Sequence, residues 1–356
     1  MGIVPFRAPS GTPAPGSPSA SALANARGPR LGVGTMAGLG LLATLSSAVV
    51  ALIGQARMAT RSIEAAAVEA ALADGTLVPP AVPGGTRAQQ RLADHLVHVR
   101  LPQGEGVYAP DGTVIAGTSE QAGRPADGGA SIHARKPLTL AMVGDSTSVG
   151  YGTRSAAELP GVILARGIAA HTGRPVRMRS HGLTGARTSD LPRQLESCLA
   201  DKPDVVVILV GANDMRDMVP PGRSAALLGQ AVAALTGAGV PVVVGTCPDF
   251  GVIAAIPQPL RSLVGGWSLR LAALQERAVV DAGGSAVPLA RLVSPQFLGN
   301  PAMFADDHFH PSGAGYERAM AVLLPAAIHE LNATAADDRG PVPRPATDPP
   351  GAQLSG

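Results

Sequence analysis

Residues 138–331 alternate between short apolar runs and longer stretches in which apolar positions recur with helical spacing. The clearest apolar runs are LTLAMV at 138–143 and DVVVILV at 204–210, and such continuous runs are typical of strands buried on both faces. Further strands are predicted at 175–180, 240–245 and 285–290, and helices at 156–171, 190–199, 225–238, 261–282 and 312–331. Strands that alternate with helices predict an α/β fold with a central parallel sheet and helices on both of its faces.

A second pattern precedes this domain, because residues 31–54 are mostly apolar and carry no charged side chain. As a helix this stretch is about 36 Å long, whereas the hydrocarbon core of a membrane is roughly 30 Å thick. The length predicts a transmembrane anchor, and the alternative is a signal peptide cleaved near the small residues Gly54 and Ala56. A slight excess of arginine before the stretch favours a cytoplasmic N-terminus. We therefore expect a single-pass protein of the cell membrane with an extracytoplasmic domain, or a secreted protein if the leader is removed.

The whole chain is predicted to contain five segments. They are a disordered tail at 1–30, an anchor or signal at 31–55, a linker region at 56–135, the α/β domain at 136–332 and a second disordered tail at 333–356. The linker region is expected to hold short helices at 62–77 and 87–99 and a hairpin that turns at Asp111-Gly112.

Charge and cysteine content narrow the classes of function. The formal net charge is only +2 and no long basic run occurs, so the chain lacks the electrostatic footprint of a nucleic-acid-binding protein. The two cysteines, Cys198 and Cys247, do not form the close pair of a zinc motif. They are either two buried thiols or, outside the cytoplasm, a disulfide.

Polar residues gather where the predicted strands end. Gly144-Asp145-Ser146 follows the first strand, 180–185 follows the second, 211–214 follows the third, and 306–311 precedes the last helix. In open parallel sheets the carboxyl ends of the strands lie along one edge, and ligands bind there. We therefore expect these four segments to meet.

The residue types in these segments are those that acyl transfer needs. A serine such as Ser146 becomes a nucleophile when a histidine removes its proton and a carboxylate orients that histidine. Asp307 and His310 are three residues apart, a spacing that brings a carboxylate to an imidazole on a turn. The expected donors to the oxyanion are the backbone N–H groups of Ser146 and Gly185 and the side-chain amide of Asn213.

Each of these motifs also has an ordinary explanation. Gly-Asp-Ser is common at helix caps, and Asp145 and Asp214 are expected to hold loops through backbone amides. His308 and His310, beside two aspartates, are an alternative metal site, although the sequence shows no further ligand cluster. The occurrence of all four segments in order favours the catalytic interpretation, in which His308 is a bystander and neither a metal nor an organic cofactor is implied.

The four segments resemble the conserved blocks of the SGNH (GDSL) hydrolase superfamily, in the family order and over residues 138–331. The matching blocks are GDST at 144–147, SHGLTGART at 180–188, GAND at 211–214 and DHFHP at 307–311. The resemblance implies a flavodoxin-like three-layer α/β/α sandwich. It also implies that Ser146 is the nucleophile, Asp307 the orienting acid and His310 the general base.

The resemblance further implies an oxyanion hole made by Ser146, Gly185 and Asn213. Ser180 stands where many family members have asparagine, so the alignment leaves Gly182 as the alternative to Gly185. Thr147 replaces a common leucine without touching the chemistry.

The implied activity is hydrolysis of a small-molecule or lipid ester, with the membrane as a second partner through the N-terminal helix. The segment 247–270 is expected to shape the acyl site, and its apolar residues favour a short- to medium-chain acyl group: Phe250, Val252, Ile253 and Ile256. With one Trp and three Tyr, the chain has few of the aromatic side chains that are common in carbohydrate sites. The alternatives are an acyltransferase or deacetylase acting on cell-envelope glycans or lipids, and a membrane-tethered binding module without turnover.

Overall fold

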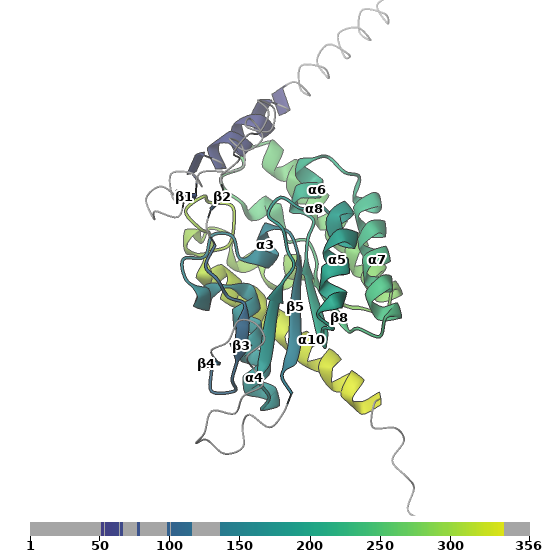
Figure 1. Ribbon diagram of the computed structural model, residues 1–356. Coiled ribbons are helices and arrows are strands. Elements are labelled where there is room, and N and C mark those ends of the chain that lie inside the picture. Colours follow the sequence, from purple (N-terminus) through teal and green to yellow (C-terminus); the bar gives the residue numbers. More distant parts are fainter. Residues whose placement is uncertain are drawn as a thin grey trace, which may run out of the picture. The chain divides into compact units, whose positions relative to one another are not determined.

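The computed structural model describes residues 51–52, 54–63, 65–66, 77–78, 98–99, 101–115 and 136–337 (Figure 1). The chain divides into two compact units, Met1–Ala51 and Leu52–Gly356, and the second contains almost all of the described residues. The predicted anchor at 31–55 lies almost entirely outside the described residues. None of the helices in the described part is both long and apolar enough to cross a membrane.

A seven-stranded sheet forms the centre of the domain, in the order β4-β3-β6-β5-β7-β8-β9. Its parallel strands are β5 (Leu138–Gly144), β6 (Val176–Ser180), β7 (Val205–Leu209), β8 (Val242–Gly245) and β9 (Ser285–Val287). Every residue of β5, β7 and β8 is buried, as their continuous apolar runs predict. Numbered along the chain, the parallel strands have the order 2-1-3-4-5 that is typical of flavodoxin-like folds.

The sheet is mixed, and the prediction of a parallel sheet was wrong at one edge. β3 (Gly106–Tyr108) pairs antiparallel with both β6 and β4 (Val114–Ile115). β3 and β4 form the hairpin expected around Asp111-Gly112, and a tight hairpin allows only antiparallel pairing. A part of the region predicted as a linker therefore extends the central sheet.

Helices cover both faces of the sheet (Figure 1). α4 (Pro160–Thr172) and α10 (Gly313–Asp337) pack on one face, and α5 (Leu191–Ala200), α7 (Pro221–Gly237) and α8 (Leu260–Asp281) pack on the other. Each face has its own cluster of buried aliphatic side chains, and each such side chain contributes about 1.5–3 kcal/mol. α10 continues to Asp337, so the first residues of the predicted C-terminal tail are helical.

Short helices connect the strands to the long helices and carry the polar segments. α3 (Ser146–Val149) begins directly after β5, α6 (Ala212–Arg216) follows β7, and α9 (Leu289–Leu292) follows β9. β9 ends earlier than predicted, because Pro288 interrupts the strand. The 3-10 helices are η2 (Ala156–Glu158), η3 (Thr188–Asp190), η4 (Phe250–Val252), η5 (Ser294–Gln296) and η6 (Pro301–Met303).

The described parts of the linker region contain strand where helix was predicted. β1 (Leu77–Val78) pairs antiparallel with β2 (His98–Val99), although both segments end predicted helices. Val78 is β-branched and precedes a proline, and both features disfavour helical backbone. Residues 51–52, 54–63 and 65–66 are helical.

Candidate active site

Ser146 is the first residue of α3, immediately after β5. Asp145 caps this short helix, since its side chain accepts a hydrogen bond from the backbone N–H of Thr147 at 2.9 Å. Burial raises the pKa of Asp145 to about 6, and the hydrogen bond from Thr147 offsets only part of that effect. Asp145 thus makes the loop-holding contact that the sequence predicted.

The serine, histidine and aspartate predicted as a triad lie in hydrogen-bonding contact. His310 Nε2 is 3.0 Å from Ser146 Oγ, and His310 Nδ1 is 2.5 Å from Asp307 Oδ2. In this arrangement one imidazole nitrogen can accept the serine proton while the other donates to the carboxylate. Ser146 and His310 are 164 residues apart in the chain, so the fold makes this contact.

A tight turn uses both oxygens of Asp307. Oδ1 accepts the backbone N–H groups of Phe309 and His310, each at 2.9 Å, and this leaves Oδ2 for the imidazole. Burial acts to raise the pKa of this carboxyl group, but the hydrogen bond and charge of His310 and the two amides outweigh it and lower the pKa below its usual value. The carboxylate form is therefore the one that faces His310.

Two aromatic rings hold the imidazole of His310. The ring of Tyr151 lies 4.4 Å from it between centroids, and the ring of Phe309 lies 5.1 Å from it in an edge-on arrangement. Tyr316 of α10 holds Tyr151 in place, because its hydroxyl donates to the backbone oxygen of Tyr151 at 2.8 Å. Burial raises the pKa of Tyr151 to about 12, so its phenol stays neutral beside the triad.

The loop that contains Gly185 is hydrogen-bonded to the strand of the nucleophile at its start and to Asn213 at its end. Leu183 N donates to the backbone oxygen of Gly144 at 3.0 Å, which anchors the start of the glycine loop. Asn213, buried in α6, donates from Nδ2 to the backbone oxygen of Ala186 at 2.9 Å, which anchors the end of the loop. Gly185 lies between these two anchors.

Gly185 and Gly182 differ in what their positions require. Gly185 has a φ of +83°, and a Cβ there would meet no atom within 4 Å. A Cβ on Gly182 would lie 2.1 Å from Ser148 Oγ, so that glycine is needed for packing. The difference favours Gly185 as the backbone donor, and this role remains a prediction.

A buried carboxylate joins the glycine loop to α6. Asp214 Oδ2 accepts the backbone N–H of Thr188 at 2.9 Å and its hydroxyl at 3.0 Å. The Thr188 hydroxyl also lies 3.0 Å from Ser224 Oγ. Asp214 therefore holds a loop, as expected from the sequence, and it does so beside Asn213.

Two buried glutamines that hold strand ends were missed by sequence reasoning. Gln194 Nε2 donates to the backbone oxygen of Gly144 at 2.9 Å, and Gln194 Oε1 accepts the N–H of the same residue at 2.8 Å. Gln275 accepts from Cys247 N at 2.7 Å and donates to Val210 O at 3.1 Å. Each glutamine lies among apolar side chains on the buried face of its helix. A glutamine at an otherwise apolar position of the helical pattern is the sequence signal that identifies such a residue.

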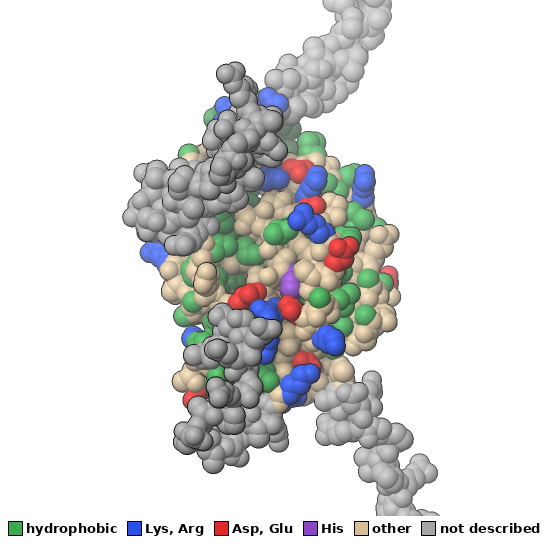
Figure 2. All heavy atoms as spheres, in the orientation of Figure 1, with side chains coloured by type: hydrophobic (Ala, Val, Ile, Leu, Met, Phe, Trp, Pro, Cys, Tyr) green, Lys and Arg blue, Asp and Glu red, His purple; other side chains and the backbone are tan. Residues whose placement is uncertain are grey.

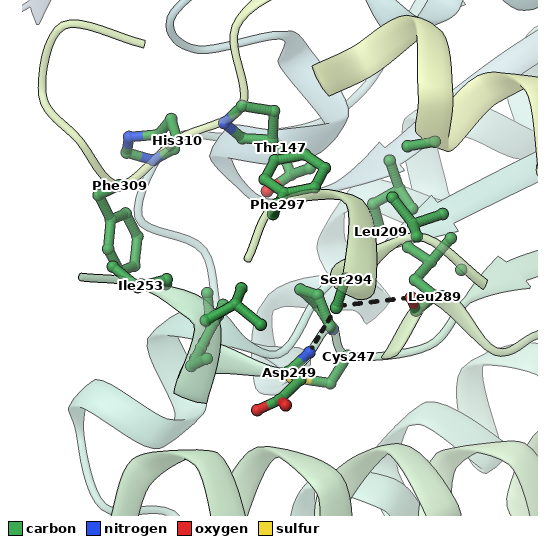
Figure 3. Close-up of a pocket in the computed structure, with 18 of the residues that line it drawn as sticks. Thr147, Leu209, Cys247, Asp249, Ile253, Leu289, Ser294, Phe297, Phe309 and His310 are labelled. Carbon is green, nitrogen blue, oxygen red and sulfur yellow. Dashed lines mark hydrogen bonds between the residues drawn. The ribbon is translucent and has the colours of Figure 1, made fainter. Parts of the chain in front are cut away.

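A cavity of about 100 Å³ opens beside Ser146 (Figure 3). Phe250, Val252 and Ile253 line it, as expected for an acyl site. Ile256 is buried in a neighbouring apolar cluster and is not among the lining residues. Five of the eight Phe, Tyr and Trp side chains in the described ranges line this cavity, which composition alone did not reveal.

The two cysteines are both free and buried, so the disulfide alternative is wrong. Cys198, on the buried face of α5, packs in the core, whereas Cys247 lines the cavity. Burial raises the pKa of Cys198 to about 12 and raises that of Cys247 further above its usual range. Neither thiol is therefore poised as a nucleophile.

The alternative metal site at His308 and His310 is not assembled. His308 is exposed, with a φ of +56°, while His310 is engaged with Ser146 and Asp307. In the ranges that the structure describes, no group of three or more His, Cys, Asp or Glu side chains is placed to hold a metal.

Arginines close to the site segments pair with carboxylates. Arg154 contacts Asp306 at 2.7 Å, and Asp217 lies 2.9 Å from Arg216 and 3.5 Å from Arg187. Basic and acidic side chains are interspersed on the face shown in Figure 2, in keeping with the small net charge. These exposed pairs are worth little in stability.

The contact between serine, histidine and aspartate lies at the carboxyl edge of a flavodoxin-like sheet. This combination defines a class of α/β protein with a serine-centred site. Residues 142–318 match the model of the GDSL-like lipase/acylhydrolase family. A GDSL-like esterase of Mycobacterium tuberculosis is 44% identical over 188 residues, which are 52% of this chain and 60% of that relative. The match thus spans less than two thirds of the relative's length.

Parts of the chain also resemble solved structures. An extracellular lipase from Streptomyces rimosus is 20% identical with a TM-score of 0.41, and the match covers 53% of this chain and 99% of the lipase. A lipase/acylhydrolase from Enterococcus faecalis is 24% identical with a TM-score of 0.41, covering 53% of this chain and 94% of that protein.

Proposed function

We propose that this protein is a serine hydrolase that cleaves carboxylic esters, with Ser146 as the nucleophile, His310 as the general base and Asp307 as the orienting acid. The 3.0 Å contact between Ser146 Oγ and His310 Nε2 carries the proposal. The family of residues 142–318 and the esterase name of the mycobacterial relative support it.

The first half of the reaction forms an acyl-enzyme. His310 Nε2 takes the proton of Ser146 as Oγ attacks the ester carbonyl carbon, and the carboxylate of Asp307 stabilises the imidazolium. The imidazolium then protonates the alcohol oxygen as the C–O bond breaks. In the second half, His310 removes a proton from water as the water oxygen attacks the acyl carbon. The bond between that carbon and Ser146 Oγ then breaks, the imidazolium returns the proton to Oγ, and the acid is released.

The negative oxygen of each tetrahedral intermediate needs donors that are fixed in advance. The backbone N–H groups of Ser146 and Gly185 and the Nδ2 group of Asn213 take this role in our proposal. One N–H of the Asn213 side-chain amide donates to the backbone oxygen of Ala186, so the second N–H is available to the substrate. The two hydrogen bonds that anchor the glycine loop support this assignment, because they fix the loop on both sides of Gly185.

The acid part of the ester is a short- to medium-chain acyl group. The apolar cavity beside Ser146 supports this choice, since Phe250, Val252 and Ile253 offer hydrocarbon contacts. A transfer of the acyl group to an alcohol other than water would use the same site, and product analysis distinguishes it from hydrolysis.

Substitution of the nucleophile tests the proposal. Ser146→Ala is expected to lower the turnover of p-nitrophenyl butyrate by at least about 10⁴-fold. The variant should keep the circular dichroism spectrum and melting temperature of the native protein, and it should lose labelling by a fluorophosphonate probe. Ser262→Ala, at an exposed serine of α8, is the matched control and should behave as the native protein. Turnover retained in Ser146→Ala would contradict the proposal.

We further propose that residues 31–55 anchor the chain in the cell membrane with the hydrolase domain outside the cytoplasm. The uncharged stretch at 31–54 supports this location. The full chain is expected to stay with membranes during alkaline carbonate washing, and a chain that begins at residue 56 should not. Release of a soluble form with a new N-terminus near residue 56 would instead indicate a cleaved signal.

A further inference from the structure

The cavity beside Ser146 runs from the triad into the interior of the domain. Figure 3 shows Phe309 and His310 at one end of it and Leu209 and Leu289 at the other. Leu209 ends β7 and Leu289 begins α9, so the far end lies beneath the carboxyl edge of the sheet, on the face that α10 covers.

Aromatic side chains form much of the wall. The four phenylalanines among the described residues all line the cavity. Phe297 and Phe304 meet edge to face with ring centroids 5.1 Å apart, and Phe250 and Phe309 lie 5.7 Å apart. Such paired rings present a rigid hydrocarbon surface, because each ring has few rotamers and fixes its neighbour.

Buried aliphatic side chains close the far end. Leu289, Val293 and Ala319 line the cavity and are 6%, 4% and 8% exposed. All three belong to the apolar core on the α10 face, where packing leaves little freedom to move. An acyl chain that enters at Ser146 therefore ends against these three side chains, which we call the floor of the cavity, and not in solvent.

The polar side chains of the inner wall already bond within the protein. Tyr316 donates its hydroxyl to Tyr151, Ser294 accepts the N–H of Asp249 at 2.9 Å, and Asp249 accepts that of Gly251 at 2.7 Å. A hydroxyl group carried into this wall by a substrate exchanges its bonds to water for contacts with hydrocarbon, which weakens binding by roughly tenfold or more.

We infer that this cavity is a closed acyl pocket for unsubstituted aliphatic acids, and that Leu289, Val293 and Ala319 set the maximum chain length. The inference rests on the proposed ester hydrolysis at Ser146. An apolar cavity of about 150 Å³ in another protein holds one benzene molecule, so about 100 Å³ has room for roughly four carbon atoms beyond the carbonyl. The preferred acids thus have up to about five carbons in all.

A series of p-nitrophenyl esters from acetate to dodecanoate, assayed with the full chain, tests the limit. Each methylene buried in the pocket contributes about 0.8 kcal/mol, so kcat/KM should rise roughly fourfold per carbon up to about five carbons. It should then fall at least about tenfold by the decanoate, because longer chains do not fit. The 3-hydroxybutyrate ester should react at least about tenfold more slowly than the butyrate ester.

Substitutions in the floor test which residues set the limit. Leu289→Ala and the milder Val293→Ala are expected to raise the ratio of octanoate to butyrate turnover at least about tenfold, by lengthening the pocket. Ala319→Leu is expected to lower the same ratio, by filling it. Leu323→Ala is the matched control, since Leu323 is buried in the same core on α10 but does not line the cavity, and the ratio should not change.

The outcomes separate this inference from the proposed function. A Ser146-dependent activity that keeps rising through the dodecanoate, or a ratio that floor variants and control alter equally, overturns the closed pocket and leaves the hydrolase intact. An absence of Ser146-dependent turnover with every ester overturns the hydrolase itself.

Discussion

The side-chain amide of Gln194 bonds to both backbone polar groups of Gly144, at 2.8 Å to its N–H and at 2.9 Å to its C=O. β6 pairs with β5 only as far as Met142, so Gln194 serves the end of β5 where a neighbouring strand is lacking. Gly144 must itself be glycine, since its φ is +133° and a Cβ would lie 1.9 Å from Leu209 O. The glutamine thereby fixes the backbone two residues before Ser146.

Truncation of Gln194 should lower both the free energy of unfolding and the turnover rate. Gln194→Ala removes the acceptor of the buried Gly144 N–H, whereas Gly144 O keeps its hydrogen bond from Leu183 N, and we expect the free energy of unfolding to fall by about 1–3 kcal/mol. We also expect kcat to fall about tenfold with little change in KM, because displacement of Ser146 affects the transition state more than substrate binding. Urea unfolding and steady-state kinetics measure the two effects. Gln296→Ala, at an exposed glutamine, is the control, and equal kcat in both variants would refute the positioning role.

The oxyanion assignment predicts a selective loss of kcat. Asn213→Ala should lower kcat by roughly 10²–10³-fold and leave KM nearly unchanged, because the donor acts on charge that develops in the transition state. Asn300→Ala removes a surface cap whose side chain accepts from Ala302 N, and it should leave kcat as in the native protein. A loss in Asn213→Ala that appears only in KM speaks against the assignment.

Gly185 and Gly239, both open glycines in left-handed turns, allow a matched comparison. Gly185 and Gly239 have φ values of +83° and +75°, and a Cβ on either meets no atom within 4 Å. Alanine should cost each position about 1–2 kcal/mol of stability. Only Gly185→Ala should also reduce kcat, by about tenfold or more, because the N–H there moves as the turn relaxes. Equal activity in both variants would exclude Gly185 as a donor.

Asp145 should make stability depend on pH. Its folded-state pKa of about 6 lies above the usual 3.8, so between these values the folded protein holds a proton that the unfolded chain has released. Its contribution to stability is therefore full below pH 3.8 and is lost as the pH rises through 6. Relative to the native protein, the unfolding free energy of Asp145→Asn should rise by about 3 kcal/mol between pH 4 and 7.

Asp111 provides a control of opposite sign. Hydrogen bonds from Thr113 lower the pKa of the exposed Asp111, so the native protein should lose stability relative to Asp111→Asn as the pH falls toward 3. Denaturant titrations at several pH values measure both variants. A flat difference for Asp145→Asn across the range would mean that its carboxyl group is not perturbed by burial.

The local patterns of the sequence determined the five parallel strands, the five main helices and the identity of the site segments. Runs such as 138–143 and 204–210 report burial on both faces through neighbouring residues alone, and the turn that joins Asp307 to His310 is also local. Prediction from sequence was possible there because the physical cause lies within a few residues of the effect.

Tertiary structure decided what depends on residues far apart in the chain. The hairpin at 106–115 joins an edge of the sheet whose pairing no local pattern specifies, which is why a parallel sheet was predicted. The bonds of Gln194 to Gly144 span 50 residues, and the cavity is lined from β7, α9 and α10. Side chains that meet only after folding fill or leave space according to the packing of whole elements. The size and the lining of the cavity could therefore be determined only from the fold.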